Sequence, residues 1–354
     1  MTKQLTHLGF ASLLALAAGT AAMAADQATE DAARKEGAVA IYSATDLALV
    51  QPMIDAFNKK FPEIRVDYND LNTNIIYNRV ISEAAAGQMG GDIVWNSAMD
   101  LQMRLAKDGY FAAYPSDQSA ALPGWAKYQD TLYATTVEPV GMIYNKLAIP
   151  EDKVPATQAA LTAFLATPEA KGKVATFDPE KSGIGFLIQT NDAATTKGFW
   201  DMVKAFGAAG GKTYSSTGSM RETVSSGENV IAFNLIGSYA LDWAKDSQTL
   251  GVSFDPEHTA AFSRLAAVAD KAPHPNAAKV FLDFMLSQEG QSALAEHGLP
   301  SVRTDVTSGF NLETIGARVG GHLDPIAVDD TLLTYVDPMK RVKFLRDWAS
   351  AGKS

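Results

Sequence analysis

The sequence predicts an α/β protein of two lobes, each built on a doubly wound, mostly parallel sheet. Three observations carry this prediction. Short apolar strands alternate with amphipathic helices between residues 39 and 107, the alternation breaks at residues 131–149, and a second α/β unit follows. Strands that alternate with helices over short turns form parallel sheets. The extended break between the two units therefore indicates a connection between lobes.

The first unit begins with a helix at residues 27–36 and then repeats strand and helix three times. The expected strands are 39–42, 64–70 and the segment GGDIVWNS, and the expected helices are 47–61, 72–88 and 99–107. Leu49, Met53 and Phe57 form one apolar stripe of the second helix, which Pro62 ends. Asn72, Thr73 or Asn74 is the expected N-cap of the third helix.

The second unit follows the extended segment Thr131–Ile149, whose two strand-like runs bracket Glu138-Pro139. We expect helices at 158–165, from Phe186 after the loop DPEKSGIG, at 199–206 and after Gly237, with strands at 174–177 and 230–235. The segment TAAFSRLAAVADKA is predicted to be a returning crossover strand, and HPNAAKVFLDFMLSQEGQSALAEHG a helix pair of the first lobe. VKFLRDWASAG is predicted to be an amphipathic helix packed on a lobe.

This order predicts a discontinuous first lobe. We assign residues 25–136 and 261–354 to the first lobe and 141–255 to the second, with a hinge near 135–140 and 256–265. Two lobes joined by extended crossovers predict a cleft between domains, a common location for small-molecule sites.

The N-terminus predicts export. Residues 1–24 have the charged Lys3, an apolar stretch from Leu8 to Ala18 and the A-x-A site Ala22-Met23-Ala24, so we expect a signal peptide cleaved after Ala24. A membrane anchor is the alternative for this segment. The absence of cysteine excludes disulfides, thiolate metal sites, a cysteine nucleophile and a lipid-modified cysteine anchor. We therefore expect a soluble, untethered protein in the bacterial periplasm.

The charge balance argues against nucleic acid as a partner. Removal of Lys3 with the signal peptide leaves 29 of the 30 basic residues against 40 acidic ones, a net charge of −11. Affinity for nucleic acid comes largely from Lys and Arg on phosphates. A small anionic ligand remains compatible, because a few local groups can outweigh a distant net charge.

The sequence contains none of the motifs G-x-S-x-G, H-E-x-x-H and G-x-G-x-x-G, and no Walker loop. The histidines of the mature chain are scattered singly, without metal-ligand spacing. We predict neither an enzyme, nor a cofactor, nor a metal site. A secreted hydrolase of the same fold is the enzymatic alternative.

Five segments, in chain order, carry a resemblance to a known family: VAIYSATDL, GGDIVWNSAMDLQMRLAKDGY, VGMIYNK, HPNAAKVFLDFMLSQEGQ and GLPSVRTDV. Together they resemble the type II periplasmic solute-binding proteins of ABC transporters. The first three are similar to the first strand, the second cleft strand and the crossover of that family, and the last two to its late segment. The subgroup resembled is the ferric-iron type, which includes binders of hexose phosphates, phosphoglycerate and aminoethylphosphonate. The resemblance implies that two lobes close on a solute and deliver it to an inner-membrane ABC permease. We expect a monomer.

Within that subgroup, the sequence departs from the ferric-iron binders. Those proteins present two adjacent tyrosines after the strand that matches VIAFNLIGS, but here Tyr239 is followed by Ala240. They often add a histidine after the first strand, where this chain has Ser43-Ala44-Thr45. One tyrosine supplies little of the oxygen shell that a ferric ion prefers. Ferric iron is therefore an alternative ligand and not the expected one.

The candidate ligand contacts follow the carboxyl ends of strands, where doubly wound sheets bind ligands, or precede helices. The predicted residues are Ser43, Thr45, Asp46, Asn72, Thr73, Asn96, Ser97, Thr136, Glu138, Ser182, Gly183, Ser216, Ser238 and Tyr239. Each Ser, Thr or Asn before a helix has a second interpretation as an N-cap. Asp46, Glu138 and Asp178 are caps, hinge partners, or acceptors for sugar hydroxyls or an amine.

Helix N-termini and hydroxyl donors are what a phosphate group requires. We therefore expect a small phosphorylated organic anion as ligand, with a sugar phosphate or phosphoglycerate first and an aminoalkyl phosphonate second. A sensing role, in which the binder docks on a histidine-kinase ectodomain, needs the same closing cleft. It stays open as an alternative.

Overall fold

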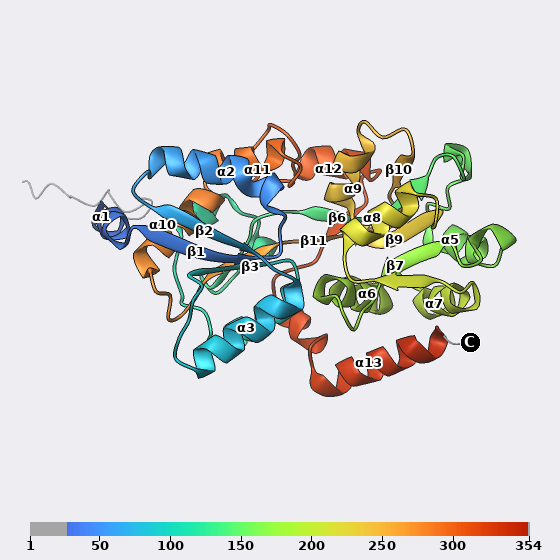
Figure 1. Cartoon of the computed structure of the whole chain (residues 1–354), viewed down its shortest axis with the longest axis horizontal. Coiled ribbons are helices and arrows are strands. Elements are labelled where there is room, and N and C mark those ends of the chain that lie inside the picture. The colour runs from blue at the N-terminus through green and yellow to red at the C-terminus, as the bar shows by residue number, and fades with distance from the viewer. Residues whose placement is uncertain (1–26, 353–354) are drawn as a thin grey trace, which may run out of the picture.

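The computed structural model describes residues 27–352, which form two α/β lobes side by side (Figure 1). The predicted signal peptide, residues 1–24, lies outside the described residues. Within this described part, no helix has the length and apolar character needed to cross a membrane. The predicted two-lobed α/β architecture is confirmed.

The first lobe contains a six-stranded sheet in the order β2-β1-β3-β12-β5-β4. Its strands are β1 (Ala38–Ser43), β2 (Arg65–Asp70), β3 (Ile93–Asn96), β4 (Lys127–Tyr128), β5 (Leu132–Ala134) and β12 (Leu265–Val268). β1 pairs in parallel with β2 and β3, and Ser43 lies opposite Asp70 and Trp95. The carboxyl ends of these three strands therefore meet at one edge.

Helices cover both faces of this sheet (Figure 1). They are α1 (Gln27–Glu36), α2 (Leu47–Lys60), α3 (Thr73–Ala85), α4 (Met99–Lys107), α10 (Pro275–Leu286) and α11 (Gln288–Glu296). Val50, Met53 and Phe57 of α2 are buried, as the apolar stripe predicts. Phe57 makes edge contacts with Phe281 and Phe284 of α10, which attach that helix to the first lobe.

The second lobe contains a seven-stranded sheet. Its strands are β6 (Glu138–Asn145), β7 (Val174–Phe177), β8 (Lys212–Tyr214), β9 (Ile231–Ile236), β10 (Leu250–Ser253), β11 (Thr259–Phe262) and β13 (Leu323–Pro325). Its helices are α5 (Gln158–Leu165), α6 (Gly183–Thr195), α7 (Phe199–Ala208), α8 (Thr217–Ser225) and α9 (Gly237–Ala244). β7 is parallel to β8 and β9, whereas β6 is antiparallel to β9, β10 and β11. Strands contributed by the crossovers thus make both sheets mixed.

The chain crosses between the lobes at two adjacent places. It leaves β5 and enters β6 through residues 135–137, and it leaves β11 and enters β12 through Ser263 and Arg264. The crossings are hydrogen-bonded to each other, because Thr135 N–H donates to the Arg264 carbonyl over 2.9 Å and Arg264 N–H donates to Thr136 Oγ1 over 3.0 Å. Trp95 is fully buried beside them and donates from Nε1 to Thr135 Oγ1 over 2.8 Å.

The C-terminal region departs from the predicted division, which assigned all of 261–354 to the first lobe. β13 pairs with β11 in the second sheet, and α13 (Pro338–Ala351) packs on α7 of the second lobe. α12 (Leu312–Arg318) and the 3-10 helix η5 (Asp330–Thr334) lie between the returning crossover and α13 in the chain. α6 also begins at Gly183, not at the predicted Phe186, because Ser182 caps the helix from the end of the expected loop.

Candidate ligand-binding site

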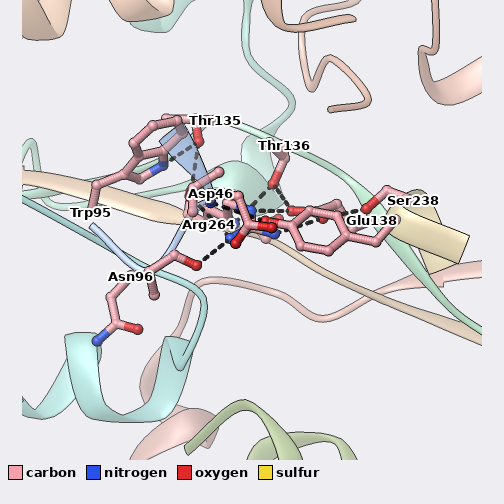
Figure 2. Close-up of polar contacts among 12 residues, drawn as sticks. Asp46, Trp95, Asn96, Thr135, Thr136, Glu138, Ser238 and Arg264 are labelled. Atoms are coloured by element: carbon pink, nitrogen blue, oxygen red, sulfur yellow. Dashed lines mark hydrogen bonds and ion pairs between the residues drawn. The ribbon is translucent and has the colours of Figure 1, made fainter. Parts of the chain in front are cut away.

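A fully buried ion pair joins the two crossovers. The side chains of Arg264 and Glu138 both have 0% exposure. Arg264 Nε donates to Glu138 Oε1 over 2.7 Å, and Nη2 donates to Oε2 over 3.1 Å (Figure 2). A bidentate pair of this kind fixes the orientation of both groups. Its two charges cancel, so it adds little net charge to its surroundings.

The ion pair also connects the two lobes. Arg264 Nη1 donates to the Ala44 carbonyl over 2.8 Å and to Thr45 Oγ1 over 3.0 Å, in the loop after β1 of the first lobe. Ser238 Oγ, at the start of α9 in the second lobe, donates to Glu138 Oε2 over 2.5 Å. Burial opposes the charge on Arg264, but the Glu138 carboxylate more than offsets it and raises the pKa of the guanidinium. Arg264 therefore stays cationic.

Tyr239 lies on this network at the first turn of α9. Its ring faces the Arg264 guanidinium at 5.2 Å, and its hydroxyl accepts a hydrogen bond from Asp46 N–H over 3.3 Å. Burial raises the pKa of Tyr239 to about 12, although the Arg264 cation acts in the opposite direction. The phenol is therefore protonated at neutral pH and keeps a proton to donate toward the cleft that it lines.

Replacing Tyr239 by phenylalanine tests this donor. The ring and its contact with Arg264 remain, and only the hydroxyl is lost. We expect the affinity for an anionic ligand to fall by about 1.5–3 kcal/mol, or roughly ten- to hundredfold. Calorimetric titration measures this directly. Wild-type affinity in the variant would assign Tyr239 to core packing.

A cleft of about 300 Å³ lies between the lobes above this network. Its polar lining comes from a strand end, loops and first turns of helices in both lobes: Asp46, Asp70, Asn72, Thr73 and Ser97 from the first, and Ser182, Ser215, Ser216, Thr217 and Tyr239 from the second. No Lys, Arg or His is among the described residues that line it. A smaller cavity of about 80 Å³, beside Asp192 and His258, is lined only by residues of the second lobe.

Several helices begin at this cleft. The N-caps of α3, α6 and α8 are Asn72, Ser182 and Ser216, and each side chain accepts a hydrogen bond from the first turn of its own helix. The cap interpretation therefore holds for these three side chains. Capping leaves other N–H groups of the first turn without a partner inside the helix, and the helix dipoles favour negative charge at this end. Thr217 Oγ1, buried at the start of α8, has no hydrogen-bond partner among the described residues.

The lobes touch at the rim of the cleft. Gly183 N–H of α6 donates to Thr73 Oγ1 of α3 over 3.1 Å, and Asn74 Nδ2 donates to the Lys181 carbonyl over 3.2 Å. A Cβ atom on Gly183 would lie 2.8 Å from Thr73 Oγ1 and from Asn74 Oδ1. A larger residue here would therefore have to displace the side chains of Thr73 and Asn74 for this contact between the lobes to form.

The structure thus divides the predicted site residues into two groups. The first group lines the cleft and consists of Asp46, Asn72, Thr73, Ser97, Ser182, Ser216 and Tyr239. The remaining predicted residues are not part of that lining: Ser43, Thr45, Asn96, Thr136, Glu138, Gly183 and Ser238. Their polar groups form hydrogen bonds within the protein. For example, Ser43 accepts one from Thr45 N–H, Asn96 bonds Thr73 and Ala98, and Thr136 donates one to Glu138. Gly183 lies at the rim of the cleft, and the other six residues of this group make the protein contacts that support it.

Sequence reasoning missed two residues. Arg264 is the one charged residue in the apolar run from Thr259 to Val268, and a lone charge in a buried strand implies a buried partner. Asp70 is the last residue of β2, and Asp46 comes shortly after the end of β1, so the strand-end argument applies to Asp70 equally. Burial raises the pKa of Asp70, and the nearby Asp46 carboxylate raises it further.

Comparison with known proteins gives this geometry a context. Residues 52–313 match the model of the bacterial extracellular solute-binding protein family. The chain is similar to the substrate-binding protein of an ABC transporter from Agrobacterium tumefaciens, with 36% identity, a TM-score of 0.84 and coverage of 89% of this chain and 94% of that one. A search of curated proteins found no match.

Two more distant structures share the fold. AfuA from Actinobacillus pleuropneumoniae, with fructose-6-phosphate bound, is 19% identical at a TM-score of 0.72 over 90% of this chain and 99% of its own. Iron-bound HitA from Pseudomonas aeruginosa is 18% identical at a TM-score of 0.70 over 89% of this chain and 99% of its own. The predicted periplasmic binding protein fold is confirmed.

Proposed function

Because this chain belongs to the bacterial extracellular solute-binding protein family, we propose that it captures a small phosphorylated organic anion for an ABC importer. Members of the family bind solutes and are not enzymes. They act outside the cytoplasm, in the periplasm or beyond it, and supply a small solute to a membrane permease. The resemblance described from the sequence is therefore confirmed at the level of the family.

The observation that carries the choice of ligand is the meeting of helix N-termini at one cleft. α3 of the first lobe and α6 and α8 of the second all begin at the cleft lining. N–H groups of first turns and serine and threonine hydroxyls are the donors that bind phosphate oxygens. A sugar phosphate or phosphoglycerate therefore ranks first. The fructose-6-phosphate bound to the similar protein AfuA supports this choice.

An aminoalkyl phosphonate is the second candidate, and two carboxylates favour it. Asp46 and Asp70 line the first-lobe wall, and the described lining offers no basic side chain. The Glu138 carboxylate offsets the charge of Arg264 below the cleft. A ligand with an ammonium group would place its cation near Asp46 and Asp70 and its phosphonate near the helix N-termini.

Ferric iron is the competing cargo, as in the similar iron-bound HitA. A ferric ion prefers phenolate and carboxylate oxygens. Among the described residues that line the cleft, Tyr239 is the one tyrosine, and the buried Arg264 cation faces its ring. The residues described contain no group of three or more His, Cys, Asp and Glu side chains that could hold a metal.

Calorimetric titration with matched pairs of solutes tests the proposal. We expect glucose-6-phosphate, fructose-6-phosphate, 3-phosphoglycerate or 2-aminoethylphosphonate to bind, and the corresponding unphosphorylated sugars, glycerate and ethylamine to show no heat of binding. A bound ligand at a hundred times its dissociation constant should also stabilise the protein by about 2.7 kcal/mol. Binding of ferric citrate without binding of any phosphorylated solute would refute the proposed ligand class.

A further inference from the structure

The C-terminal segment crosses between the lobes a third time. We call residues 330–351 the strap. Its first part, η5, packs on α4 of the first lobe, where Lys107 Nζ pairs with Asp330 Oδ1 over 2.9 Å. Its second part, α13, lies against the second lobe (Figure 1), with Phe344 stacked on Phe199 and edge-on to Phe186. The strap lies beyond residues 52–313, which match the family model.

A buried carboxyl group lies where the strap meets the lobe boundary. Asp100, in the first turn of α4, has 0% exposure, and neither carboxyl oxygen has a hydrogen-bond partner among the described residues. The same turn packs on α6 of the other lobe, since Ala98 Cβ lies 3.1 Å from the place a Cβ of Gly183 would take. Separation of the lobes therefore exposes to water the part of this turn that α6 packs on.

The cation that lowers the pKa of Asp100 belongs to the strap. Arg341, in the first turn of α13, places its guanidinium 4.1 Å from the ring of Phe186 in α6, and its buried Nη1 has no partner among the described residues. Tyr335, between η5 and α13, is a titratable group that interacts with Asp100 and also with Asp329 and with Asp192 of α6. The first turn of α6, Gly183 to Leu187, has no titratable side chain. Arg341 thus belongs to the second-lobe side and Asp100 to the first.

We propose that Asp100 and the strap form an acid-sensitive latch: a protonated Asp100 stabilises the contact between the lobes, and an ionised Asp100 destabilises it. A carboxylate without hydrogen bonds is costly to bury. Protonation removes that cost. The inference rests on the lobe motion expected of a solute-binding protein, and it does not depend on which solute is bound.

The direction of the effect follows from the two states. With the lobes in contact, burial raises the pKa of Asp100 to about 7. The Leu101 N–H, which is not placed well enough to form a hydrogen bond, and the Arg341 cation offset this only in part. With the lobes apart, water reaches the carboxyl group and its pKa returns toward the ordinary value near 4. The contact between the lobes is therefore most stable at low pH. Its stability falls as pH rises from about 4 to about 7 and does not change further above about pH 7. Between pH 5 and pH 8 the ratio of contacting to separated lobes should fall about a hundredfold.

An interlobe distance measurement tests the latch without any ligand. The chain has no cysteine, so spin labels can be placed at Ile75 in the first lobe and Leu147 in the second, which are 53% and 80% exposed. Double electron–electron resonance on the ligand-free protein should give more of the long-distance population at pH 8 than at pH 5. Asp100→Asn should hold the short-distance population at both pH values, and Arg341→Met should move the transition to higher pH.

Asp192 provides a matched control. Burial raises its pKa to about 6, so it titrates in the same range, but it lies in α6 of the second lobe. Asp192→Asn should retain the wild-type pH response. A distance distribution that does not change with pH in the wild type, or a response that persists in Asp100→Asn, would overturn the proposal. Calorimetric titration of solutes is a separate measurement, so failure of the latch is distinguishable from failure of the proposed function.

Discussion

Replacing Arg264 by methionine is expected to destabilise the protein by about 3–5 kcal/mol, because the fully buried Glu138 carboxylate would lose its partner. The loop at Ala44 and Thr45 would also lose its two bonds to the guanidinium. Urea unfolding of the purified variant measures the change. Ligand affinity should fall as well, since this loop leads directly into Asp46 at the cleft.

The double variant Arg264→Met with Glu138→Gln serves as the test of the pair. Removal of both charges leaves no uncompensated ion, so the double variant should be more stable than Arg264→Met alone. Arg65→Met is the matched surface control, because Arg65 and Asp67 form an exposed pair at 72% and 44% exposure, and solvent-exposed ion pairs contribute little to stability. A loss in Arg264→Met no larger than in Arg65→Met would show that the buried pair does not hold the lobes together.

Replacing Gly183 by valine is expected to reduce ligand affinity about ten- to hundredfold, or roughly 1–3 kcal/mol. The added side chain would meet Thr73 and Asn74 of the other lobe. The obstruction lies across the cleft, so the lobes should fold normally but fail to reach the contact seen here. Calorimetry measures the affinity, and small-angle X-ray scattering measures whether the bound protein still becomes more compact.

Gly316→Ala is the control for that experiment, because nothing lies within 4 Å of the place its Cβ would occupy. Its affinity and its radius of gyration should match the wild type. Wild-type affinity in Gly183→Val would remove the N-terminus of α6 from the site and contradict the contact between α3 and α6 as the bound arrangement.

Much of the fold could be predicted because its signals are local. Four elements have the expected bounds, Gln27–Glu36, Met99–Lys107, Gln158–Leu165 and Val174–Phe177. In these segments periodicity, caps and apolar runs agree with one another. The predicted start of α6, at Phe186, was wrong. Gly183 and Gly185 have low helix propensity, but Ser182 caps this turn, because its Oγ accepts a hydrogen bond from Gly185 N–H over 3.1 Å.

The candidate site could be predicted only to the level of its strand ends. Ser, Thr and Asn before a helix give the same pattern whether they cap the helix or contact a ligand, and only the geometry at Asn72, Ser182 and Ser216 shows the cap. The Arg264–Glu138 pair spans 126 residues in the chain, so no local pattern connects the two. The helix at VKFLRDWASAG was expected, but its place on the second lobe was not, because the packing of α13 there depends on tertiary contacts such as those of Phe344.

Native mass spectrometry of freshly purified protein tests the central claim most directly. The claim is that the cleft between the lobes holds a small phosphorylated organic anion. We predict a complex heavier than the polypeptide by the mass of one such molecule, which fragmentation releases as a phosphorus-containing ion. The extra mass should be absent from Tyr239→Phe and Gly183→Val prepared in the same way. A bound ferric ion with no organic mass, or an organic solute without phosphorus, would contradict this account.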